Sequence, residues 1–272
     1  MRPDVIAVLE PGYGELFDRV LAVCRDDERV RALWLGGSLA RGSADAVSDL
    51  DVLIAVDDVD AFAPQWRAWL ALITPTVIAH PLPFLPGSFY SVTPERLRLD
   101  VIVEAADAVP HTFFRSRLLV FDRDDLVVPP PDPAPGPSRE RIASIIEEFF
   151  RDYGMFPVGV EREDWLLGIE AIHLIRSLLY QLFLEENAPL PMMGVKQWSS
   201  KLSERQRDVL RALPTGGTNR DEIIEAHERV AVAFVTEARR IANAHDATWP
   251  DELEACTRDY LVRWNLPALE GS

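Results

Sequence analysis

The stretch from Gly36 to Ile54 has the residue types and spacing needed for chemistry on a phosphate. A Gly-Gly-Ser turn opens it, and Asp49 and Asp51 stand two positions apart near its end. In an extended strand, residues two apart point to the same face, so these carboxylates project together. Carboxylates held side by side repel one another unless a divalent cation neutralises them, and oxygen-only ligation suits Mg²⁺. The pair therefore predicts a magnesium site.

The turn upstream of the carboxylates predicts a place for a polyphosphate. Glycines let the backbone pass close to a ligand, and Ser38 and the amides after it can donate hydrogen bonds. Arg41 can add a charge-assisted contact or brace the turn. Together with the carboxylates, these residues predict a nucleoside triphosphate site.

The pattern G-G-S-x2-R-G-x5-S-D-x-D-x-x-I, over residues 36–54, resembles the signature of the polymerase-beta-type nucleotidyltransferase superfamily. Every signature residue is present. The resemblance implies transfer of a nucleoside monophosphate, with AMP from ATP as the expected donor reaction, and release of pyrophosphate. It also implies Mg²⁺ ligands at Asp49 and Asp51 and nucleotide contacts at Gly37, Ser38, Arg41 and Ser48.

The family's third carboxylate, on a later strand, has a counterpart in this chain. Asp100 lies in the alternating segment 97–104, which predicts a strand beside the first pair. Glu104 and Glu95 are alternatives for the same role. The resemblance leaves open whether Asp100 is a metal ligand, the general base, or both.

Two further groups in the second half of the chain are candidates for the site. Some relatives take the base from their helical half, where Glu163 and Glu170 are seven residues apart and are expected on one helical face. Lys196 and Lys201 are the only lysines, and Lys196 is the preferred triphosphate contact as a compact point charge. Ordinary surface positions are the alternative for all of them.

Length and composition are typical of a globular protein with one large or two moderate domains. The chain has 272 residues, of which 48% are hydrophobic and 26% charged. It contains no run of 18 or more purely apolar residues and no apolar leader after Met1, which predicts a cytoplasmic protein without a membrane partner. Cys24 and Cys256 form no C-x-x-C pair and are expected to be reduced, packed thiols.

The net charge of −16 bears on the acceptor. A field this acidic disfavours nucleic acid and would attract a small cationic acceptor, although acidity can also serve solubility alone.

Periodicity and composition predict an α+β fold with a sheet domain over 1–128, a Pro-rich linker over 129–138 and a helical domain over 139–272. The resemblance implies that the first is the catalytic domain and the last the substrate-binding domain. The first part reads as a mixed sheet with flanking helices, and the second as an α-helical bundle. Expected strands are 31–36, 49–56, 76–81, 88–93, 97–104 and 118–122; expected helices are 13–29, a short one near Leu39, 59–73, 138–153, 164–187, 204–213, 221–244 and 250–264.

This two-part architecture is similar to that of aminoglycoside and lincosamide nucleotidyltransferases, which implies a hydroxyl of such a small molecule as the acceptor. Aromatic and acidic side chains are expected to contact it. The candidates are Phe89, Tyr90, His111, Phe113, Phe114, Tyr153, Trp165, Trp198, Glu161, Glu163, Asp164, Glu185 and Glu186.

Two other functions stay open at this point. One is transfer to a macromolecule such as tRNA or a protein, as in toxin-like members of the superfamily. The other is a catalytically silent nucleotide-binding module, because Arg240 and His245 match an R-x4-H pattern found in helical modules of toxin systems. The preferred nucleotide, the modified hydroxyl and the oligomeric state are not indicated by any pattern.

Overall fold

The computed structural model describes residues 2–190 and 197–269. Its contacts divide the chain into two compact units, with unit 1 ending at Pro133 and unit 2 beginning at Ala134. This division falls inside the proline-rich segment 129–138. Each unit has its own hydrophobic core. Lys196, the preferred triphosphate contact, lies outside the described residues.

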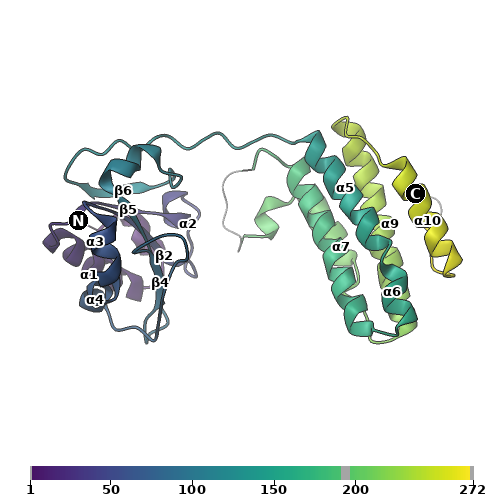
Figure 1. Cartoon of the computed structure of the whole chain (residues 1–272), viewed down its shortest axis with the longest axis horizontal. Helices are drawn as coiled ribbons and strands as arrows, with labels where there is room; N and C mark the ends of the chain where they lie inside the picture. The colour runs from purple at the N-terminus through teal and green to yellow at the C-terminus, as the bar shows by residue number, and fades with distance from the viewer. Residues whose placement is uncertain (1, 191–196, 270–272) are drawn as a thin grey trace. The chain divides into compact units, whose positions relative to one another are not determined.

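Unit 1 is built on a six-stranded mixed sheet in the order β3-β4-β5-β2-β1-β6 (Figure 1). Among the strands of the described residues, β2 and β5 are parallel and every other neighbouring pair is antiparallel. The strands are β1 (Val30–Leu35), β2 (Leu50–Val56), β3 (Ile78–Pro81), β4 (Phe89–Val92), β5 (Arg98–Ala105) and β6 (Leu118–Asp122).

Helices of unit 1 bury an apolar layer against this sheet. They are α1 (Gly12–Asp26), α2 (Gly37–Ala40), α3 (Val59–Phe62) and α4 (Trp66–Ile73), with 3-10 turns at Asp4–Val8, Ala63–Gln65 and Ala106–His111. The single helix expected over 59–73 is interrupted at Ala63–Gln65, because Pro64 lacks the amide hydrogen that would continue the ladder. Beyond the break, the Trp66 ring stacks on Phe89 at 4.8 Å between centroids.

Unit 2 is helical, as the sequence predicts. Its helices are α5 (Arg139–Tyr153), α6 (Phe156–Glu161), α7 (Trp165–Glu186), α8 (Glu204–Ala212), α9 (Arg220–Ala244) and α10 (Asp251–Arg263), with a 3-10 turn at Ser199–Lys201. The side chains of Ser138 and Asp164 accept hydrogen bonds from the first turns of α5 and α7 and so set where these helices begin. Helices α5, α7 and α9 pack against one another (Figure 1). The predicted α+β fold class is confirmed.

Helix α7 is buried along its central apolar stripe but not at its start. Its stripe from Ile172 to Leu182 is buried, but Leu166 and Leu167 at its start are 78% and 42% exposed. Leu167 is two positions from Ile169 and therefore about 200° around the helix, on its opposite side. By length and mean hydropathy (1.3) α7 would qualify as a membrane span, yet in the structure it is a core helix of unit 2.

The cysteines are both free thiols, as predicted. Cys24 is completely buried in α1, and this burial raises the pKa of its thiol. Cys256 is exposed on α10, so the expectation of a packed thiol was wrong for this residue.

Candidate active site

The glycine turn holds the Asp51 carboxylate against the backbone. The Gly36 amide donates to the Asp51 carbonyl oxygen at 2.9 Å, which ties the turn to β2. Gly37 has φ +53°, and a Cβ atom added there would overlap Asp51 Oδ2 and lie 2.6 Å from its Cγ. Glycine is therefore required at position 37 for both conformation and space.

The parallel pairing of β2 with β5 brings Asp100 beside Asp51. The two residues are direct partners in the register, so their side chains are on the same face of the sheet. Neighbouring strands lie about 4.8 Å apart, which places the two half-buried carboxylates next to each other.

The same row continues across the sheet. Tyr90 on β4 is the partner of Asp100, and His80 on β3 is the partner of Tyr90. Tyr90 is 39% exposed and its ring lies 5.6 Å from that of His80. An acidic pair and an aromatic pair are thus adjacent on one face.

A cavity of about 400 Å³ opens over these carboxylates, and all of its lining comes from unit 1. Its lining includes Asp51, Asp100, Arg41 and the Gly36-Gly37 turn, together with segments 113–116 and 131–132. Asp51, Asp100, Gly37 and Arg41, which were predicted from the sequence, therefore share one pocket.

Asp49 is positioned differently from the other two carboxylates. It precedes β2, and its Oδ2 lies 3.4 Å from Arg98 Nη1, while Arg98 also donates to the Val47 carbonyl oxygen at 3.1 Å. Over residues 2–190 and 197–269, no three His, Cys, Asp or Glu side chains are close enough together to form a metal-binding group. The structure thus joins Asp51 with Asp100 and pairs Asp49 with Arg98.

Buried polar atoms close to the turn fit an anionic ligand. In the described part of the chain, Ser38 Oγ and Arg41 Nε are buried without a hydrogen-bond partner. Such groups cost free energy unless a ligand or water completes them. Ser48 has a local role instead: its hydroxyl donates to Asp45 Oδ1 at 2.8 Å and accepts from the Asp45 amide at 3.0 Å, which closes the loop before β2.

A buried ion pair supports the loop that lines the pocket at residues 113–116. Arg117, 1% exposed, pairs with Glu104, 11% exposed, at 3.1 Å, and both contact the Thr112 hydroxyl. The Arg117 guanidinium also lies 4.8 Å from the Trp34 ring centroid. Burial lowers the pKa of Arg117, and the adjacent Glu104 carboxylate opposes that shift. Sequence reasoning missed this pair because nothing in the local pattern links β5 to the loop before β6.

Of the remaining candidate site residues in unit 1, some line the pocket and others are engaged or buried elsewhere. Glu104, the first alternative to Asp100, is engaged by Arg117, and Glu95 lies in the exposed turn before β5. Phe89 is completely buried in the core, so its predicted contact with an acceptor was wrong. Phe113, 97% exposed, and Phe114, 37% exposed, both line the pocket.

In unit 2, the common helical face expected for Glu163 and Glu170 does not form. Glu163 has φ +52° and precedes the N-cap Asp164, so it is not part of α7, whereas Glu170 is exposed on that helix. A residue with positive φ ends helical periodicity, which is why the spacing argument failed.

Other polar candidates of unit 2 are engaged in structural contacts. Glu185 accepts from the Ser138 amide at 2.7 Å and pairs with Arg141. Glu186 pairs with Arg240, which also pairs with Glu237 at 2.9 Å. The arginine of the R-x4-H pattern is therefore part of a salt-bridge network.

A glycine turn that seats one carboxylate, with a second carboxylate in register on the next parallel strand, is the arrangement that the resemblance over residues 36–54 implies for a nucleotidyltransferase. Residues 12–82 match the model of the streptomycin adenylyltransferase family. This match includes residues 36–54, from which the sequence predicts a nucleotidyltransferase, and it supports that prediction.

The chain matches several solved structures. The chain is similar to an aminoglycoside 6-adenyltransferase from Bacillus subtilis, with 17% identity and a TM-score of 0.44, over 90% of this chain and 95% of that one. It is also similar to a CCA-adding enzyme in complex with CTP, with 11% identity and a TM-score of 0.35, over 95% and 73% of the two chains. None of the curated proteins compared with the chain matches it.

Proposed function

We propose that this protein transfers AMP from ATP to a hydroxyl of an aminoglycoside, with Mg²⁺ as cofactor and pyrophosphate as the second product. The observation that carries the proposal is the pocket in which Gly37, Asp51 and Asp100 converge. The streptomycin adenylyltransferase match over residues 12–82 favours an aminoglycoside as acceptor. The net charge of −16 favours a cationic acceptor over a nucleic acid.

Asp51 and Asp100 would hold the metal, with Asp49 as a third ligand once it leaves Arg98. Their fit to Mg²⁺ rests on the oxygen-only donor set and on the space that Gly37 leaves for the Asp51 carboxylate. When bound, Mg²⁺ neutralises charge on the triphosphate and lowers the pKa of the acceptor hydroxyl. Arg41 and Ser38 present buried donors next to this carboxylate, where they would bind phosphate oxygens.

In the reaction, the acceptor oxygen forms a bond to the α-phosphorus while the bond from that phosphorus to the bridging oxygen breaks. Pyrophosphate leaves with the electron pair, and the proton of the acceptor hydroxyl passes to an Asp100 carboxylate oxygen. Tyr90 stands next to Asp100 in the register and offers an exposed ring and hydroxyl for the acceptor. Phe113 and Phe114 add apolar surface to the lining of the same pocket.

A transfer assay tests this function. The full chain is incubated with Mg²⁺ and each of the four ribonucleoside triphosphates, with streptomycin, other aminoglycosides, a lincosamide or bulk tRNA as acceptor. Pyrophosphate release and the product mass are measured. We expect a product heavier by one AMP with ATP and an aminoglycoside. Labelling of tRNA alone would support the macromolecular alternative, and silence with every acceptor would support the silent module.

Asp51→Asn is expected to lower the transfer rate by about 10²-fold or more, because it removes a charged metal ligand. Asp57→Asn is the matched control, since Asp57 follows the same strand, is 58% exposed and pairs with Arg31. Equal rates for the two variants would contradict the assignment of the site.

A further inference from the structure

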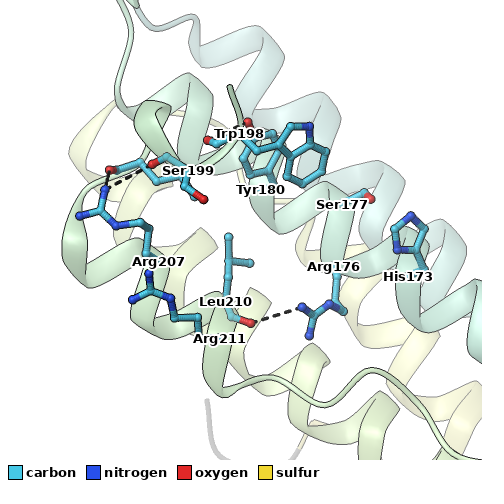
Figure 2. A pocket seen from close by; sticks show the side chains of 10 residues that line it. His173, Arg176, Ser177, Tyr180, Trp198, Ser199, Arg207, Leu210 and Arg211 are labelled. Atoms are coloured by element: carbon cyan, nitrogen blue, oxygen red, sulfur yellow. Dashed lines mark hydrogen bonds between the residues drawn. The ribbon is translucent and has the colours of Figure 1, made fainter. Parts of the chain in front are cut away.

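A second cavity, of about 290 Å³, lies entirely within unit 2 and has no part in the proposed transfer reaction (Figure 2). One wall is a face of α7 that carries His173, Arg176 and Tyr180, which are spaced three and four residues apart. The opposite wall is α8 with Arg207 and Arg211, and the segment at Trp198 lies at one end.

This cavity is cationic in a strongly acidic chain. Three arginines and a histidine line it, and none of the described residues lining it is acidic, although the chain carries 44 acidic side chains. The cavity therefore carries a local positive charge that the net charge of −16 would not suggest. Such a cavity attracts anions and repels a polycationic aminoglycoside.

Two of the arginines are held in place by neutral acceptors. Arg176 donates to the carbonyl oxygens of Leu213 and Pro214 at 2.8 Å, at the end of α8, and Arg207 donates to that of Leu202 at 2.8 Å. Carbonyl groups orient a guanidinium without neutralising its charge. Among the described residues, neither arginine forms an ion pair, so both keep their positive charge for a ligand.

The third arginine, Arg211, can change its ion-pair partner more easily. Arg211 pairs with Asp208 at 3.1 Å, three residues away on the same helix, and both side chains are more than 60% exposed. An exposed pair of this kind contributes little to stability, so Arg211 can exchange its partner for a phosphate or carboxylate at small cost.

The end of the cavity at Trp198 is a flat aromatic surface. The Trp198 ring stacks on Tyr180, with centroids 3.9 Å apart and planes 12° apart, and the Tyr180 hydroxyl donates to the Trp198 carbonyl oxygen at 3.3 Å. Tyr180 is buried, while Trp198 remains 51% exposed. A stacked indole with one side accessible is a platform for a planar ring.

We propose that this cavity binds a small anion that carries an aromatic ring, of the size and chemistry of a nucleoside monophosphate. The ring stacks on Trp198, and the anionic group lies between Arg176, Arg207 and Arg211. The volume is near the lower end of the range for ligand sites, roughly 300 Å³, which suits one base with a phosphate rather than a multi-ring antibiotic.

Calorimetric titration of the full chain with AMP in the presence of EDTA tests this site. We expect Trp198→Ala and Arg211→Gln each to weaken AMP binding by about tenfold. Trp264→Ala and Arg151→Gln are the matched controls: Trp264 is 38% exposed on the same unit, and Arg151 forms an exposed i,i+3 pair with Glu148. Both controls should bind AMP as the wild type does. Circular dichroism confirms that each variant is folded.

Adenosine and inorganic phosphate, titrated separately, divide the site into its two halves, and each should bind more weakly than AMP. Adenosine binding as tight as that of AMP would overturn the anionic half, and phosphate binding as tight would overturn the stacking half. Absence of AMP binding, or equal losses in the controls, would overturn the site itself. Because the titration contains no metal and no acceptor, its result is independent of whether transfer activity is found.

Discussion

Replacing Gly37 by alanine tests whether the glycine turn exists to seat the Asp51 carboxylate. The added Cβ would overlap Asp51 Oδ2 and lie 2.6 Å from Cγ, whereas real Cβ contacts are essentially never shorter than 3.0 Å. The flexible carboxylate must therefore swing away from its position beside Asp100. A misplacement of about 1 Å at a reacting centre can lower the rate about 10²-fold, and we expect a loss of that size in kcat.

Gly42→Ala is the matched control for this substitution. Gly42 also has positive φ, at +67° against +53° for Gly37, but a Cβ there meets nothing within 4 Å. Each variant is expected to lose about 1–2 kcal/mol of stability from the left-handed backbone. Only Gly37→Ala is expected to lose activity, so the comparison separates backbone strain from the clash with the carboxylate.

The assay is pyrophosphate release at saturating ATP and acceptor, together with urea unfolding of each variant. A Gly37→Ala protein that is folded and as active as Gly42→Ala would refute the reasoning. A double-mutant cycle adds a second readout. With Asp51 already replaced by alanine, Gly37→Ala should cost less stability than it does in the wild type. The carboxylate is then absent, and only the backbone strain and the 3.0 Å contact with the Cβ at position 51 remain.

Two further predictions concern stability. His227 is 1% exposed and stacks on Phe156, and burial lowers its pKa from 6.5 to about 4. Unit 2 should therefore be fully stable above pH 6.5 and should lose about 3 kcal/mol of unfolding free energy as the pH falls toward 4. His227→Leu should reduce this loss, as measured by urea unfolding followed by circular dichroism. An identical pH dependence in both proteins would contradict this. Arg117→Met should lower the unfolding free energy of unit 1 by about 3–5 kcal/mol, because Glu104 is left buried without its partner. Adding Glu104→Gln to this variant should recover much of the lost free energy. A loss under about 1 kcal/mol in Arg117→Met would show that the pair is dispensable.

Local sequence determined the elements that depend on neighbouring residues. The alternation through Asp49 and Asp51 indicated β2, and the side chains of Ser138 and Asp164 marked the starts of α5 and α7, because strand periodicity and helix capping act over a few residues. The glycine turn was recognisable for the same reason. Its residue types and spacing were enough to indicate a nucleotidyltransferase.

Contacts between distant segments were decided only by the tertiary structure. The resemblance already indicated Asp100 as the third carboxylate, but its direct partner, Asp51, follows from the parallel register of β2 and β5. The Glu104–Arg117 pair likewise joins β5 to a later loop. The cationic cavity of unit 2 likewise needs α7 and α8 to face each other, with Trp198 at one end. Such contacts depend on how elements pack, and a pattern read along one segment contains no information about which other segment will cover it.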